Sequence, residues 1–183
     1  MKKKILCVIP ARSGSKGIKN KNMVYLKGKP LIYWTIKVAK KIRYFDKIVV
    51  STNSKKIKKF SEKNKVEVPY LRSEKLASDK TPMDDVIRDI LKYYKNFNYL
   101  PYAVVILQPT SPFRQLSTIN NACKIFIKKK LDSLISIEEI KQAKIKLSNE
   151  SINLLIERAS GVTGSGAVCR CGTATGGSVR TAA

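Results

Sequence analysis

The chain of 183 residues contains no histidine and few acidic residues. The absence of histidine excludes Ser-His-Asp triads, His-ligated zinc sites and acid–base catalysis by imidazole. Only 13 Asp and Glu residues accompany 37 Lys and Arg residues, which gives a formal net charge of +24. We therefore expect any chemistry in this protein to depend on stabilisation by fixed charges and by bound metal.

Long apolar runs are also missing. No stretch approaches the length of a membrane-spanning helix, and the apolar segment 5–9 is too short for a signal peptide. Four cysteines are present without zinc-finger spacing: Cys7, Cys123, Cys169 and Cys171. These features predict a cytoplasmic protein with reduced thiols and no membrane partner.

The excess of positive charge is spread along the whole body of the chain, together with abundant Ile and Asn. Such a charge attracts nucleotides, sugar acids or nucleic acids over long distances. A nucleic-acid-binding protein usually has a clustered basic patch or a stacking motif instead, and biased coding DNA produces diffuse lysines without selection for binding. We expect no specific nucleic-acid partner, and a basic nucleic-acid-binding domain without catalysis stays an alternative.

Strand-like and helix-like segments alternate along the body. The patterns predict strands over 4–9, 47–52, 102–107 and 132–137, an extended run over 66–71, and helices over 30–41 and 54–64. Two further helices are expected to be capped by Thr81 and Ser117, with Asp84 and Asp85 as residues of the helix start rather than metal ligands. This rhythm predicts an α/β protein with three αβα layers and a mostly parallel sheet.

The segment after the first predicted strand combines small side chains with cations. It reads Ile9-Pro-Ala-Arg-Ser-Gly-Ser-Lys-Gly17, and Lys21 and Asn22 follow shortly afterwards. Small residues let backbone N–H groups approach an anion, and Arg or Lys side chains bind phosphate oxygens. The segment matches neither G-x-x-x-x-G-K-[ST] nor G-x-G-x-x-G. It predicts a polyphosphate-binding loop of another nucleotide fold, and a solvated turn is the alternative.

A second polar segment, Gln108-Pro-Thr-Ser-Pro112, comes directly after the predicted strand 102–107. Ligands of open α/β sheets bind outside the carboxyl ends of the strands. Right-handed crossovers would bring this loop and the loop after the first strand to the same edge of the sheet.

Three segments together resemble the acylneuraminate cytidylyltransferases, also called CMP-sialic acid synthetases. They are Ile9–Ile18 with Lys21-Asn22, then Leu76-Ala-Ser-Asp79, and Leu107-Gln-Pro-Thr-Ser-Pro-Phe-Arg114. The resemblance covers roughly the first three quarters of the chain. It implies a Rossmann-like fold of the nucleotide-diphospho-sugar transferase type. It also implies transfer of CMP from CTP to a nonulosonic (sialic, legionaminic or pseudaminic) sugar acid, with Mg²⁺ assistance and pyrophosphate release.

The resemblance also implies roles for individual residues. Arg12 and Lys21 match positions that contact the triphosphate and serve catalysis, and Asn22 matches the residue that reads cytosine, although it could equally form a turn. Arg114 would pair with an acid or stabilise its loop. The remaining expected nucleotide contacts are Ala11, Ser13, Gly14, Ser15, Lys16 and Ser78, and the expected ribose and sugar-acid contacts are Gln108, Thr110 and Ser111.

Members of this family continue into a lobe that forms the homodimer and carries an Asp-x-Asp pair for magnesium. We expect residues 1–158 to be a nucleotidyltransferase domain that is incomplete at its C-terminal end. Residues 159–183 contain no acidic residue and no Lys, Ile or Leu. This Gly/Ala/Ser/Thr-rich tail reads as a flexible linker or as run-on translation. The metal ligands are therefore unknown, the homodimer of the family is not assumed for this chain, and the activity of this chain stays open.

A CMP-Kdo synthetase is the enzymatic alternative. Its phosphate loop normally has Arg and Pro where this chain has Lys16-Gly17-Ile18, so the resemblance to it is weaker.

Overall fold

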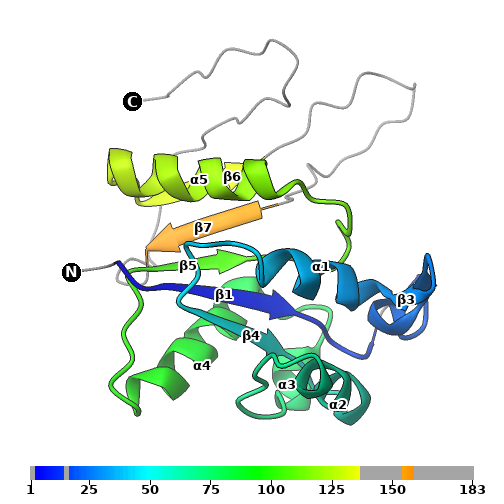
Figure 1. Cartoon of the computed structure of the whole chain (residues 1–183). Helices are drawn as coiled ribbons and strands as arrows, with labels where there is room; N and C mark the ends of the chain where they lie inside the picture. The colour runs from blue at the N-terminus through cyan, green and yellow to red at the C-terminus, as the bar shows by residue number, and fades with distance from the viewer. Residues whose placement is uncertain (1–2, 15–16, 137–153, 159–183) are drawn as a thin grey trace, which may run out of the picture.

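A computed structural model describes residues 3–14, 17–136 and 154–158, and a five-stranded sheet runs through its centre (Figure 1). The strand order is β4-β1-β5-β7-β6. The bounds of these strands are Lys47–Ser51 for β4, Ile5–Pro10 for β1, Ala103–Ile106 for β5, Leu154–Arg158 for β7 and Ser133–Ser136 for β6.

The sheet is mostly parallel, as the sequence predicts. Strand β1 pairs in parallel with β4 and with β5, whereas β7 is antiparallel to both β5 and β6. The arrow of β7 accordingly runs against those of β1, β4 and β5 in Figure 1. Strand β7 was not predicted, because its five residues find their partners only through pairing with segments far away in the chain.

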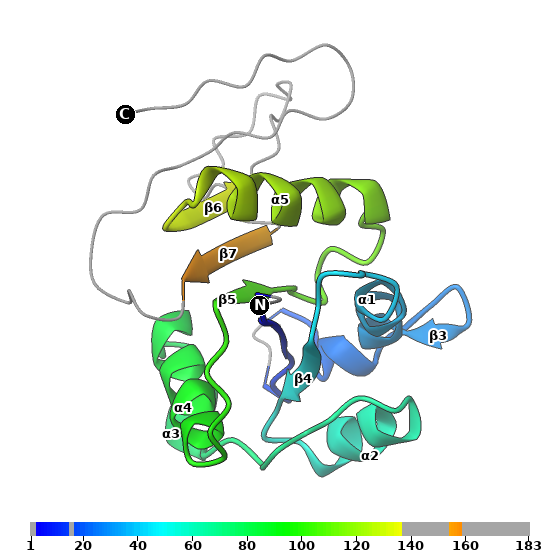
Figure 2. The ribbon, with the colours of Figure 1, turned by 60° about the vertical axis from the view of Figure 1, so that its left-hand side comes forward.

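Helices cover both faces of the sheet, which confirms the predicted three-layer αβα class. The helices are α1 (Leu31–Ala39), α2 (Lys55–Lys63), α3 (Glu74–Ala77), α4 (Met83–Lys95) and α5 (Leu116–Lys129). Helices α1 and α5 lie on one side of the sheet, and α4 lies on the other (Figures 1 and 2). None of the helices in the described ranges is long and apolar enough to cross a bilayer.

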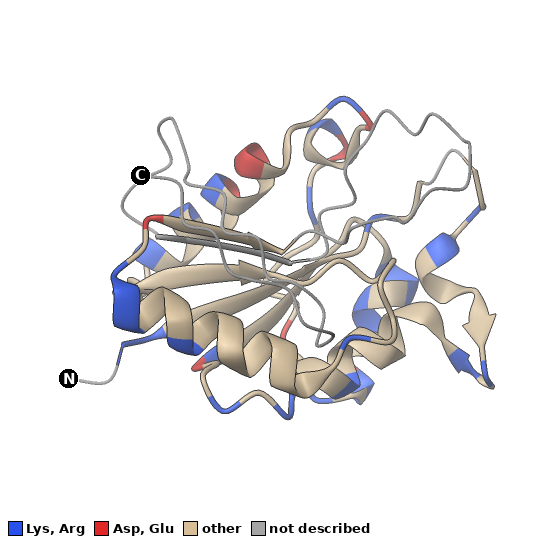
Figure 3. Ribbon diagram, turned by 90° about the horizontal axis from the view of Figure 1, so that it is seen from above, with Lys and Arg blue, Asp and Glu red and all other residues tan. Residues whose placement is uncertain are grey.

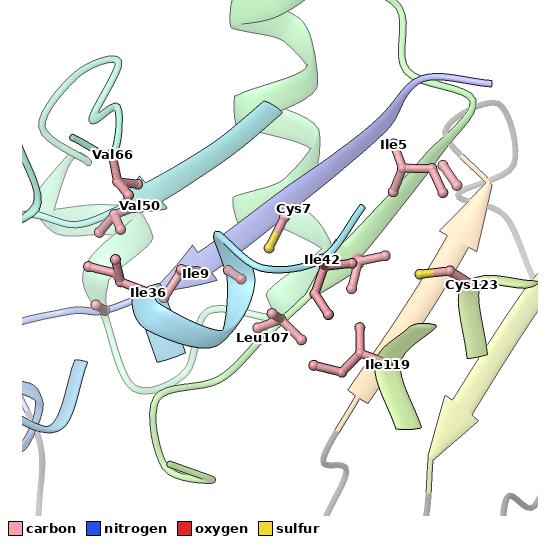
Figure 4. Close-up of a cluster of buried hydrophobic side chains, with 14 of the residues drawn as sticks. Ile5, Cys7, Ile9, Ile36, Ile42, Val50, Val66, Leu107, Ile119 and Cys123 are labelled. Carbon is pink, nitrogen blue, oxygen red and sulfur yellow. The ribbon is translucent and has the colours of Figure 1, made fainter. Parts of the chain in front are cut away.

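The alternation of side chains along the central strands divides the core into two clusters. In β1, Ile5, Cys7 and Ile9 belong to the cluster under α1 and α5 (Figure 4), whereas Leu6 and Val8 pack with α4. All five are fully buried, because a central strand with helices on both faces has no solvent side.

The helix starts confirm one predicted boundary and correct two caps. Ser54 caps α2, since its hydroxyl accepts a hydrogen bond from Ile57 N at 3.3 Å. The predicted cap at Thr81 is wrong: its hydroxyl donates to Lys75 O at 2.8 Å, and Pro82 precedes α4. The predicted cap at Ser117 is also wrong, because α5 begins one residue earlier at Leu116. Asp84 and Asp85 lie in the first turn of α4, as predicted.

A small hairpin that the sequence did not predict connects the first loop to α1. After the 3₁₀ turn η1 (Lys21–Met23), strands β2 (Tyr25–Leu26) and β3 (Lys29–Pro30) pair antiparallel. Lys27 and Gly28 between them both have positive φ, as a type I′ hairpin turn requires. The Trp34 indole of α1 donates to Leu26 O at 3.0 Å and fixes the hairpin against the helix.

Candidate functional site

The two polar loops start at the carboxyl ends of neighbouring strands. Strands β1 and β5 are adjacent and parallel, and Leu107 N donates to Val8 O at 3.0 Å just beyond β5. The first loop leaves the sheet at Ala11, which is buried and donates to Ser51 O at 2.9 Å, and the second leaves at Gln108. The prediction that both loops lie at one edge of the sheet is confirmed.

Arg12 connects the first loop to the segment after α3. Its Nη2 forms an ion pair with Asp79, and its Nη1 donates to Ala77 O at 3.3 Å. Its side chain is 32% exposed, so the charge lies at the surface of the site rather than in the core. The structure thus brings the segment that contains Ser78 beside the first loop, and Ser78 itself is exposed.

Asn53 holds the first loop from the side of β4. Its Oδ1 accepts from Ser13 N at 2.9 Å, and its Nδ2 donates to Glu74 Oε1 at 3.3 Å. Asn53 was not predicted as a site residue, although an Asn directly after a predicted strand is a recognisable signal of a turn residue. Gly14 is exposed, and Ser15 and Lys16 lie outside the described residues.

The turn η1 is tied to the same loop. Asn22 is buried, and its side-chain amide donates to Arg12 O at 2.9 Å. Lys21 N donates to Ile18 O at 3.1 Å just before this turn, and Lys21 is partly buried. The structure therefore gives Asn22 a role in holding the loop, and its contact with cytosine stays a prediction.

Arg114 stabilises the second loop, which was one of its two predicted roles. Its Nη1 donates to Ser111 O at 2.7 Å and its Nη2 donates to Gln108 O at 2.5 Å. Burial lowers the pKa of Arg114 to about 10, so the guanidinium stays charged at neutral pH. Gln108 is partly buried and Thr110 is exposed, so this loop offers polar groups at the edge of the sheet.

Arg72 is a buried cation that the sequence analysis missed. It is 6% exposed, and its guanidinium binds Ser51 Oγ at 3.1 Å, Ser51 O at 2.7 Å and Leu76 O at 3.4 Å. Burial lowers its pKa, and the nearby charge of Arg12 acts in the same direction. Arg72 thereby fixes α3 to the end of β4, next to the Arg12 loop. A lone Arg among many Lys residues was the only signal in the sequence.

The described residues contain no group of three or more Cys, Asp or Glu side chains that could hold a metal ion. Figure 3 shows Lys and Arg on several helices and loops rather than in one patch. The site is therefore a set of cations and backbone groups at one sheet edge, suited to binding an anion.

Comparison with known proteins adds a family match. Residues 6–160 match the family of cytidylyltransferases. The CMP-N,N'-diacetyllegionaminic acid synthase of Legionella pneumophila is 43% identical over 122 residues, which cover 67% of this chain and 53% of that protein. The N-acylneuraminate cytidylyltransferase of Escherichia coli is 39% identical over 126 residues, covering 69% of this chain and 29% of that protein. The matched region thus spans about half or less of these relatives.

Solved structures share the fold at low sequence identity. A CMP:2-keto-3-deoxy-manno-octonic acid synthetase complexed with CTP gives a TM-score of 0.67 at 13% identity, over 86% of this chain and 75% of that one. A cytidylyltransferase from Leptospira borgpetersenii gives 0.61 at 18% identity, over 86% and 61% of the two chains.

Proposed function

Because this chain belongs to the cytidylyltransferase family, we propose that it transfers CMP from CTP to a nonulosonic sugar acid and releases pyrophosphate. The relatives at 43% and 39% identity are named for CMP-legionaminic acid synthesis and for N-acylneuraminate cytidylyl transfer. A pseudaminic acid cytidylyltransferase of Campylobacter jejuni is 30% identical over 74% of this chain and 59% of its own length. These three names share a cytidine nucleotide and a sugar acid.

One observation carries the proposal: Arg12 and Gln108 follow adjacent parallel strands, so the two polar loops meet at one edge of the sheet. In an open α/β sheet, this edge is where ligands bind. The Arg12 side would receive the triphosphate, and the Gln108 loop would receive the ribose and the sugar acid.

In the proposed reaction, the anomeric hydroxyl of the sugar acid attacks the α-phosphorus of CTP. A new oxygen–phosphorus bond forms, the hydroxyl proton passes to solvent water, the bond between the α-phosphorus and the bridging oxygen breaks, and the pyrophosphate takes up the electron pair. Negative charge therefore grows on the leaving group in the transition state. Arg12 and Lys21 would stabilise that charge, because fixed cations cost no reorganisation at the moment of reaction.

The family resemblance implies Mg²⁺, and the described residues contain no cluster of three or more Cys, Asp or Glu side chains for it. Magnesium bound beside a nucleotide usually takes only one or two protein carboxylates, together with phosphate oxygens and water. Asp79 forms an ion pair with Arg12, one of the proposed phosphate contacts. We assign no step to the metal.

The test is a calorimetric titration of CTP, with Mg²⁺ present, into the full chain and into Arg12→Ala. We expect the variant to bind CTP at least about tenfold more weakly, because it loses a charge-assisted contact with phosphate. Arg43→Ala is the matched control, because Arg43 is exposed and contacts only Tyr44 among the described hydrogen bonds. Equal affinity of the chain and of Arg12→Ala for CTP would contradict the proposal.

A further inference from the structure

The guanidinium of Arg12 is held from one side by a single short segment. Ala77 O and the Asp79 carboxylate engage its two terminal nitrogens, Nη1 and Nη2. Ala77 lies 65 positions further along the chain, so this is a tertiary contact. A guanidinium presents its N–H donors as a rigid planar fork. Fixing both terminal nitrogens therefore fixes the direction in which the remaining donors point.

The turn that carries Asp79 is closed by its own hydrogen bonds. Lys80 N donates to Ser78 Oγ at 3.2 Å, and Thr81 N donates to Ser78 O at 3.3 Å. The Thr81 hydroxyl also binds Lys75 O at 2.8 Å and so joins the far end of the turn to α3. Asp79 is thus presented from a defined turn, not from a freely rotating loop.

Helix α3, which precedes this turn, is itself anchored to the sheet. Arg72 bridges Leu76 O and Ser51 at the end of β4, and Asn53 bridges Glu74 and the backbone of Ser13. The support that reaches Arg12 therefore begins at the carboxyl end of a sheet strand. The orientation of the Arg12 guanidinium therefore depends on contacts that reach back to the central sheet.

We propose that Asp79 is a positioning residue of the triphosphate site: it orients the guanidinium of Arg12 and acts on the phosphates only through it. The proposal rests on the proposed function and extends it. A carboxylate near a triphosphate repels it, so without a bridging cation Asp79 has no favourable direct contact to offer. If Asp79 instead competed with the phosphates for Arg12, replacing Asp79 would tighten CTP binding, because a competitor would be removed.

The experiment is a double-mutant cycle read by CTP calorimetry on the full chain, with Arg12→Ala, Asp79→Ala and the double variant. We expect Asp79→Ala to weaken CTP binding by about tenfold, within the range of coupling between contacting residues. In the Arg12→Ala background, the same substitution should cause no further loss, because Asp79 acts through Arg12. Asp79→Asn should lose less than Asp79→Ala, since its amide oxygen still accepts a hydrogen bond.

Asp85→Ala is the control for net charge, because Asp85 is exposed in the first turn of α4. Thermal unfolding of each variant verifies that it is folded. If Asp79→Ala does not fold, the same comparison is made with Asp79→Asn. A chain that itself binds no CTP would overturn the proposed function together with this inference. Two results would overturn this inference alone, provided that the unsubstituted chain binds CTP. One is that the Asp79 variants bind CTP as tightly as that chain or more tightly, and the other is that the loss of affinity from Asp79→Ala adds to the loss from Arg12→Ala.

Discussion

At the scale of single residues, the site is organised by arginines that bind backbone carbonyls. Arg72 and Arg114 each bind main-chain oxygens at the end of a strand, Ser51 O for the former and Gln108 O for the latter. A planar fork can hold two acceptors at once, which the ammonium group of lysine does less well. In a chain with so many lysines, arginine at these two positions therefore has a geometric reason.

Arg114→Ala should destabilise the protein by about 2–3 kcal/mol, because two charge-assisted hydrogen bonds to Gln108 O and Ser111 O are lost. Arg114→Lys should recover only part of this loss, since lysine lacks the fork. Urea unfolding measures both effects. Arg43→Ala, at an exposed position, should stay within about 0.5 kcal/mol of the unsubstituted chain. Equal stability of the Arg114→Ala and Arg43→Ala variants would show that the loop does not depend on Arg114.

At the scale of elements, two serines near helix starts separate a true cap from an apparent one. Ser54 has extended backbone dihedrals and accepts a hydrogen bond from Ile57 N, whereas Ser117 is already inside α5 and exposed. A capping hydroxyl satisfies one of the free N–H groups of the first turn, and a serine within the helix does not replace it.

Ser54→Ala should therefore cost about 1 kcal/mol of stability, whereas Ser117→Ala should be neutral or slightly stabilising because alanine has the higher helix propensity. Each variant loses one serine hydroxyl, so thermal or urea unfolding of the two compares the stability lost at the two positions. A larger loss for Ser117→Ala than for Ser54→Ala would contradict the assignment of the caps.

At the scale of the whole molecule, β7 joins the two parts of the sheet. Within the described residues, β6 pairs with β7 alone, and β5 uses β7 on the side away from β1. The antiparallel strand thus completes the hydrogen bonding of β5 and attaches β6 to the rest of the sheet. The hydrogen bonds of a sheet edge that is buried have to be satisfied, so this strand matters for stability.

A chain that ends after Arg158 should unfold at the same urea concentration as the full chain, in keeping with our prediction that the domain comprises residues 1–158. A chain that ends after Ser136 lacks β7 and should lose several kcal/mol, because it gives up the ladders on both sides of that strand. Urea titrations of the three chains test both expectations. Equal stability of the shortest chain would show that β7 is dispensable, and a lower midpoint for the 158-residue chain would contradict the domain boundary.

The positions of the two loops could be predicted because their causes are local. Apolar runs define β1 and β5, and the polar residues that follow each run must emerge at the strand ends. The caps at Thr81 and Ser117 were predicted wrongly because only part of their cause is local. A hydroxyl beside a helix start is visible in the sequence, but its hydrogen-bond partner is not.

The sequence alone determined the αβα class and the common edge of the two loops, since periodicity and parallel pairing follow from the order of residues. Only the tertiary structure decided the insertion of β7 between β5 and β6, the support by Asn53 and Arg72, and the pairing of Arg12 with Asp79. The physical reason is distance along the chain. These contacts join segments that meet only after the sheet has formed, and no local pattern of residues specifies which side chains will then contact one another.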